Sequence, residues 1–140
     1  MKITRFEDIQ CWQEARKLVK MVYEAVRSNS DFQKDFRLSG QITAAAVSSM
    51  SNIAEGFSRR SNRDFVQFLF ISKSSATEVQ SEAYVALDQE YIAQEIFEEI
   101  YNQAEAVSKL DSGLITYLLE SEKQRKKPNE HNKLNKLEGR

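Results

Sequence analysis

Apolar residues recur at intervals of three and four along most of the chain, which is the spacing of amphipathic α-helices. Proline occurs once, at Pro128, and no run of alternating β-branched residues indicates a strand. The pattern predicts helices from Phe6 or Asp8 to Arg27, from Asp35 or Leu38 to Glu55, from Ser61 or Asn62 to Leu87, and from Ala93 to Leu119. Because short links favour antiparallel neighbours, we expect an all-α fold, an up-down-up-down antiparallel four-helix bundle.

The predicted links carry boundary signals. After Arg27, the polar segment Ser28–Asp31 interrupts the apolar period with side chains that compete for backbone hydrogen bonds. Phe32 and Phe36 are expected to anchor this connection to the bundle. At the next link, Ser61–Asp64 places a side-chain acceptor at the helix cap and an acid in the first turn, where the helix dipole favours negative charge.

The helix predicted around residues 38–55 has small or apolar side chains on nearly every side, which is typical of a helix enclosed by neighbours. It ends in the segment Asn52-Ile53-Ala54-Glu55-Gly56, where the glycine suits a helix C-terminus because it can adopt a positive φ. We interpret Asn52 and Glu55 as part of a polar network that fixes this turn or a subunit interface. A ligand-binding or catalytic acid is the alternative.

Some apolar surface remains after one bundle core is filled. In the third predicted helix, Val66, Phe70 and Ile71 lie off the core-facing stripe. The fourth predicted helix carries its own stripe at Ile96, Ile100, Ala104, Val107, Leu110, Leu114 and Leu118. Gly113 lies inside that helix at a cost of up to about 1 kcal/mol relative to alanine, which a closely crossing neighbour would explain. We expect copies of the chain to associate and bury the excess apolar surface.

Length and charge predict one domain with a basic tail. The 140 residues are enough for a sizeable core. Residues 1–120 hold 13 Lys and Arg against 18 Asp and Glu, a net charge of −5, whereas residues 121–140 hold 7 against 3, a net charge of +4. We expect a bundle over 1–120 and a basic, disordered tail over 121–140. The sequence has no secretion signal or membrane-spanning run, so the expected location is cytoplasmic.

The sequence lacks the residue combinations that enzymes and cofactor sites need. Cys11 is the only cysteine, which excludes an intrachain disulfide and a cysteine zinc cage. Glu78 and Glu82 lie one turn apart, but the only histidine, His131, falls outside the predicted bundle, so a di-iron site is rejected. There is no phosphate-binding glycine loop and no nucleophile–base pair. We predict no enzyme activity, no cofactor, no metal and no small-molecule substrate.

Two basic clusters are candidate nucleic-acid sites. Arg59, Arg60 and Arg63 surround the link between the second and third predicted helices, and guanidinium groups bind phosphates in a bidentate way. The alternative is a solvated turn in which these arginines pair with Glu55 and Asp64. The tail carries a second basic run, which either binds nucleic acid or keeps the chain soluble. That run consists of Lys123, Arg125, Lys126 and Lys127.

A set of residues between Phe6 and Leu119 matches the pattern of a known family. The set comprises Phe6, Trp12 and Ala15; Phe36-Arg37-Leu38 and Gln41-Ile42; Ala45-Ala46-Val47-Ser48 and Asn52-Ile53-Ala54-Glu55-Gly56; and Phe65, Phe68-Leu69, Ser74-Ser75, Glu78, Tyr91-Ile92 and Leu114. With these residues the chain resembles the 23S rRNA intervening-sequence proteins, a family of small four-helix bundles. That family is related to the accessory variability protein of diversity-generating retroelements.

The resemblance implies a pentameric ring of bundles without known catalysis. It also implies a nucleic-acid partner, RNA or DNA, or a reverse transcriptase. We therefore expect a non-enzymatic homo-oligomer, a homopentamer, that acts as a scaffold or adaptor for a protein or nucleic-acid partner. Direct nucleic-acid binding through the arginine cluster and the basic tail is the alternative.

Overall fold

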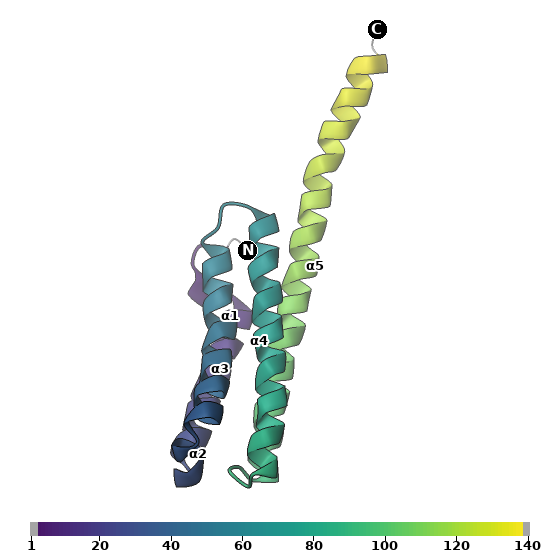
Figure 1. Ribbon diagram of the computed structural model, residues 1–140. Coiled ribbons are helices and arrows are strands. Elements are labelled where there is room, and N and C mark those ends of the chain that lie inside the picture. The colour runs from purple at the N-terminus through teal and green to yellow at the C-terminus, as the bar shows by residue number, and fades with distance from the viewer. Residues whose placement is uncertain (1–2, 139–140) are drawn as a thin grey trace.

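The computed structural model describes the backbone of residues 3–138 and the side chains of residues 3–125. This part of the chain is all-α, as predicted, and contains no strand. Its elements in order are the 3-10 helix η1 (Phe6–Asp8) and the helices α1 (Gln10–Arg27), α2 (Ser30–Lys34), α3 (Phe36–Phe57), α4 (Asn62–Asp88) and α5 (Gln94–Glu138). The long helices α1, α3, α4 and α5 lie side by side, and α5 extends well past the others (Figure 1).

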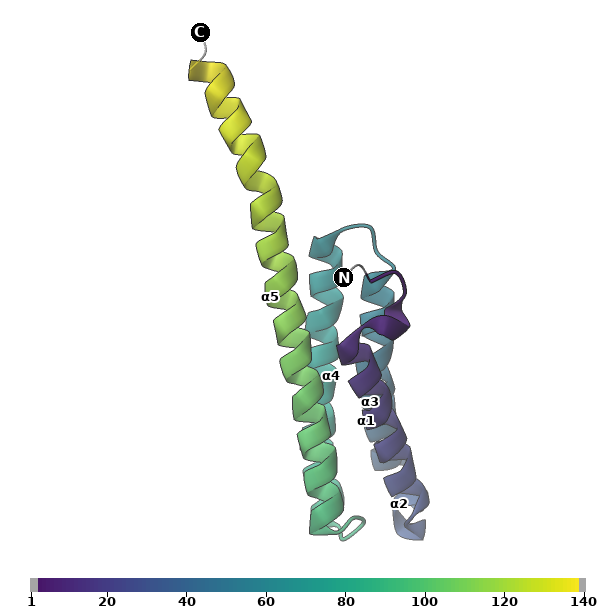
Figure 2. The same cartoon turned by 180° about the vertical axis from the view of Figure 1, so that it is seen from behind.

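The long helices surround one core. Helices α3 and α5 each contact both α1 and α4. The N-terminal segment and the α3–α4 link lie at the same end of the bundle, beside the part of α5 that extends beyond it (Figure 2). Ser61 caps α4 by accepting a hydrogen bond from the backbone N–H of Asp64 at 3.2 Å, which confirms the predicted cap.

A short helix that the sequence analysis did not predict, α2, links α1 to α3. The side chain of Asn29 caps it by accepting a hydrogen bond from the N–H of Phe32 at 2.9 Å, and Asp35 caps α3 in the same way at 3.0 Å. Asn29, which was interpreted as part of a helix break, therefore acts as a cap, and Asp35 caps α3 at one of its two predicted starts. Phe32 is buried and stacks on Tyr91, as expected of an anchor, whereas Phe36 is 83% exposed and the prediction for it was wrong.

The buried stripe of α5 differs from the predicted one. Its members are Phe97, Ile100, Ala104, Val107, Ser108, Asp111, Ile115 and Leu118. Ile96 is 37% exposed, contrary to the prediction, and Leu110 and Leu114 are only partly buried. The prediction failed because it assigned core positions to apolar residues alone, whereas Asp111 occupies a fully buried one. On α4, Val66 is also buried, so its expected place outside the core was wrong.

A polar layer crosses the core and takes one side chain from each long helix. It consists of Cys11 of α1, Ser49 of α3, Ser72 of α4 and Asp111 of α5, all of them buried. The hydroxyls of Ser49 and Ser72 lie 3.0 Å apart, and Ser72 Oγ donates to Asp111 Oδ2 at 2.7 Å. Because Ser72 uses its proton for the carboxylate, Ser49 is the donor in the first contact. We call these residues the four-helix polar layer.

The last helix is longer than the sequence pattern suggested. Regular structure was expected to end after Leu119, but α5 continues to Glu138. Residues 120–127 consist mainly of strong helix formers, which favour continuation of the helix. The division into a bundle over 1–120 and a separate tail over 121–140 stays a prediction. Within the residues described, no helix combines the length and the apolar content needed to cross a bilayer.

Candidate functional site

The segment from Asn52 to Gly56 forms the end of α3 and contacts α4. Asn52 Nδ2 donates to the backbone oxygen of Ser48 at 2.7 Å and to the Ser48 hydroxyl at 3.0 Å. That hydroxyl lies 2.9 Å from the hydroxyl of Ser75 on α4. These contacts agree with the interpretation of Asn52 as part of a structural network. Glu55, by contrast, is exposed and lies outside it.

Gly56 lets α4 approach the last turn of α3. A Cβ at this position would lie 2.7 Å from Cβ of Phe68 and 2.9 Å from the ring of Phe65. Gly56 does not have a positive φ, and α3 continues to Phe57, so the expectation of a left-handed helix end was wrong. The close contact between α3 and α4, not the backbone conformation, is what requires glycine here.

The arginines at the α3–α4 link differ in their partners. The guanidinium of Arg59 donates to Glu55 Oε1 at 2.9 Å and lies 4.8 Å from the centroid of the Phe68 ring. This pairing matches the solvated-turn interpretation for Arg59. The ion pairs found among the described side chains include neither Arg60 nor Arg63. These two arginines therefore have positive charge available for an anion.

Arg60 lines a groove at the end of the bundle, between the α3–α4 link and α5. We call it the end groove and define it by Phe57, Arg60, Asn62, Phe65, Leu114 and Tyr117. Its volume is about 630 Å³, and Tyr117 is 69% exposed. Tyr117 was not predicted as a site residue. The available signal was an aromatic residue one turn beyond Leu114, at the edge of the apolar stripe. The combination of a base, an amide and an exposed ring can hold an anion attached to a planar group.

The predicted basic run lies on α5 beyond this groove. Lys123 and Arg125 are exposed, and Arg125 Nη1 lies 3.9 Å from Glu122 Oε1. The side chains of Lys126 and Lys127 lie outside the described residues. Since α5 passes the α3–α4 link before it leaves the bundle, both predicted basic clusters are at one end of the molecule (Figure 1).

The outer surface of α3 and α4 exposes apolar side chains, as predicted. Phe70 and Tyr84 are 47% and 50% exposed, and Ile71 and Val85 are 47% and 45% exposed. The residues of each pair are about two heptads apart, so each pair lies along one side of α4. Val47 of the neighbouring helix α3 is 37% exposed. We call these five residues the α3–α4 face.

Two carboxyl groups of α4 belong to the same region. Glu82 Oε2 is buried and has no hydrogen-bond partner among the described residues. Burial, and then interaction with Glu78, raises the pKa of Glu82 to about 7. The described residues contain no group of three or more side chains arranged to hold a metal ion. The α3–α4 face therefore gains negative charge as the pH rises through about 7.

Cys11 lies in the four-helix polar layer rather than at the surface. Its side chain is 2% exposed, and burial raises the pKa of its thiol. A thiol attacks as its thiolate, so this environment disfavours nucleophilic chemistry.

Comparisons with known proteins give a family and a structural neighbour. No curated protein matches the chain. A solved structure of a protein of unknown function from the S23 ribosomal protein family of Bacteroides thetaiotaomicron is similar, with 26% identity and a TM-score of 0.70. The alignment covers 75% of this chain and 97% of that one. The family of 23S rRNA-intervening sequence proteins matches residues 7–113. Because this match covers more than half of the sequence, the chain belongs to the 23S rRNA-intervening sequence protein family.

Proposed function

We propose that this protein is a non-enzymatic helical scaffold that self-associates through the α3–α4 face. The observation that supports this is the pair of apolar rows on α4, Phe70 with Tyr84 and Ile71 with Val85, all close to half exposed. Rows separated by about two heptads suit a second helix packed alongside. Contiguous apolar surface of this kind marks an interaction site more often than isolated apolar residues do.

The finer features of the proposal come from the family resemblance. The bundle is an up-down-up-down antiparallel one, consistent with its short α3–α4 and α4–α5 links. The assembly is a homopentamer in the cytoplasm, and it presents a repeated surface to a reverse transcriptase, another protein partner or a nucleic acid. Repetition around a closed ring strengthens weak contacts through multivalency.

The oligomeric state tests the proposal directly. In light scattering coupled to size exclusion at micromolar concentration, we expect the unaltered protein to form an oligomer. Ile71→Arg and Val85→Arg should each convert it to monomers, because a charge would be buried in an apolar contact. Leu119→Arg is the matched control, since Leu119 is 47% exposed like Ile71 but lies on α5. A monomeric unaltered protein, or an oligomer that survives both α4 substitutions, contradicts the proposal.

A second candidate function, direct nucleic-acid binding at the end groove, has one supporting observation. Arg60 lies there beside Asn62 and the exposed ring of Tyr117. Replacing Arg59, Arg60 and Arg63 by alanine should then weaken binding and reduce its salt dependence. Unchanged affinity in this variant contradicts the assignment.

A further inference from the structure

We infer that a second surface, a groove along α1, binds single-stranded nucleic acid. The groove runs between α1 and α3 and has a volume of about 1120 Å³. We call it the α1 groove and define it by Trp12, Arg16, Lys20, Tyr23 and Arg27 of α1 and Met50 of α3. None of these residues belongs to the end groove or to the α3–α4 face.

The basic side chains of the α1 groove form a row. Arg16, Lys20 and Arg27 are exposed, and at 1.5 Å rise per residue they span about 16 Å of helix. None of them belongs to an ion pair among the described side chains. The opposite wall is neutral, because α3 carries no charged residue from Leu38 to Ala54. The row therefore keeps its positive charge for a ligand, although residues 1–120 as a whole are acidic.

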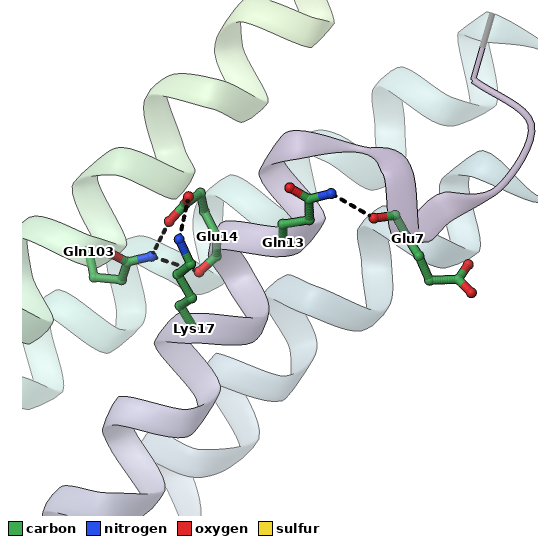
Figure 3. A network of polar contacts seen from close by, with 5 residues as sticks. All are labelled: Glu7, Gln13, Glu14, Lys17 and Gln103. Atoms are coloured by element: carbon green, nitrogen blue, oxygen red, sulfur yellow. Dashed lines mark hydrogen bonds and ion pairs between the residues drawn. The ribbon is translucent and has the colours of Figure 1, made fainter.

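Hydrogen bonds and ion pairs engage Glu14 and Glu7, two of the acids near the row, whereas Glu24, between Lys20 and Arg27 in sequence, is exposed. Gln103 of α5 donates to the backbone oxygen and to Oε2 of Glu14, both at 2.8 Å, and Lys17 donates to Glu14 Oε1 at 3.1 Å (Figure 3). Gln13 donates to the backbone oxygen of Glu7 at 2.9 Å (Figure 3). The carboxylate of Glu7 pairs with Arg5. The buried residues Ala15, Leu18 and Val22 turn one side of α1 toward the core, so the row of basic side chains on its other side is exposed.

Aromatic rings among the basic side chains favour a nucleic acid over other polyanions. Tyr23 is 40% exposed in the groove and lies between Lys20 and Arg27 in sequence. The guanidinium of Arg16 lies 5.9 Å from the centroid of the Trp12 ring. Trp12 is only 8% exposed and anchors Arg16, so Tyr23 is the ring on which an unpaired base can stack while its phosphate meets the neighbouring cation. A duplex hides its base faces, so the ligand class is a single strand, with RNA and DNA sharing the required chemistry.

The test measures fluorescence anisotropy of labelled single-stranded oligouridylate, oligothymidylate and a duplex of the same length, at several salt concentrations. We expect both single strands to bind more tightly than the duplex. Combined Arg16→Gln, Lys20→Gln and Arg27→Gln should lower the affinity at least ten-fold and reduce the salt slope by about 2, because three phosphate contacts are lost. The charge-matched control combines Lys34→Gln, Lys73→Gln and Lys109→Gln, and it should change the affinity less than three-fold.

Two further variants separate this site from its competitors. Tyr23→Leu keeps an apolar side chain but removes the stacking ring, so it should weaken oligonucleotide binding about five-fold or more and leave inorganic polyphosphate binding unchanged. Combined Arg59→Gln, Arg60→Gln and Arg63→Gln tests the end groove, and whatever loss it causes should add to that of the α1-groove triple variant and not replace it. The inference would be overturned by equal losses in the groove and control variants, or by a loss confined to the variant of Arg59, Arg60 and Arg63. It would also be overturned if polyphosphate or poly-glutamate bound as tightly as the oligonucleotides.

Light scattering on the same samples shows whether assembly is intact, so a failure of the proposed scaffold is distinguishable from a failure of this inference. If the groove triple variant unfolds, Lys20→Gln alone should still reduce the salt slope by about 0.7, and an unchanged slope would overturn the inference.

Discussion

Replacing Asp111 by asparagine tests how the four-helix polar layer contributes to stability. The Asp111 side chain is fully buried, and Oδ2 accepts a hydrogen bond from Ser72 at 2.7 Å. Oδ1 makes no hydrogen bond of normal geometry with the described residues, although the Cys11 thiol lies beside the carboxyl group. Asparagine has almost the same shape and keeps an oxygen for Ser72, but it cannot ionise.

The expected magnitude follows from the pKa. Burial is the main cause that raises the pKa of Asp111 from 3.8 to about 6, against hydrogen bonding to Ser72 and Cys11, which lowers it. The folded protein therefore holds this proton at pH values where the unfolded chain has lost it. The stability that the protonated group contributes is complete below about pH 4 and is lost as the pH rises through about 6. At about 1.4 kcal/mol per pKa unit, ionisation costs about 3 kcal/mol.

Urea unfolding followed by circular dichroism measures this cost. As the pH rises from about 4 to about 7, the unaltered protein should lose about 3 kcal/mol of unfolding free energy relative to Asp111→Asn. Glu120→Gln, which removes an exposed carboxylate of the same helix, controls for general charge effects and should show almost no such change. Both comparisons use one protein concentration, since assembly adds to apparent stability. A difference between Asp111→Asn and the unaltered protein that stays constant with pH would refute the reasoning.

Two further predictions concern α3, α4 and α5. Gly56→Ala should destabilise the protein by about 1–2 kcal/mol in the same unfolding assay, because its Cβ would overlap Phe68. Gly113→Ala should instead stabilise it by up to about 1 kcal/mol, because nothing lies within 4 Å of the added Cβ and alanine favours the helix. Self-association, measured by light scattering, should weaken as the pH rises through about 7, where Glu82 ionises near Glu78, and Glu82→Gln should remove that dependence. Opposite signs for the glycine variants, or a pH dependence that persists in Glu82→Gln, would contradict these expectations.

Apolar spacing was sufficient to predict the long helices but not every position that they bury. The stripe of α4 and its cap at Ser61 follow directly from the residue pattern. The pattern failed where a polar residue type can either interrupt a helix or cap the next one. Asn29 interrupts an apolar period, which indicates a break, yet its side chain caps the next helix. Only the backbone conformation distinguishes a break from a cap.

The candidate sites were less predictable, because charge along a sequence does not reveal where side chains meet. Arg59 belongs to the most obvious basic cluster, yet its guanidinium is already paired with Glu55. The bases of the α1 groove are scattered among acids in sequence and gave no signal as a cluster. Their spacing of four and seven residues places them on one side of α1, but the engagement of nearby Glu14 depends on Lys17 and on Gln103, which lies 89 positions further along the chain. A contact over that separation cannot be inferred from local periodicity.

The four-helix polar layer also bears on how small-residue helices keep one alignment. Side chains such as those of Ala44 to Ala46 offer little shape that would distinguish one register of α3 against α4 from the next. A slide of α3 by one helical turn would separate Ser49 from Ser72, and a slide of α5 would leave the buried carboxyl of Asp111 without Ser72 as its donor. An unsatisfied buried polar group costs about 1–3 kcal/mol, and a charged one costs more. The layer therefore lowers stability at neutral pH through Asp111 while it penalises every shifted register, which is how a buried polar residue specifies alignment in coiled coils.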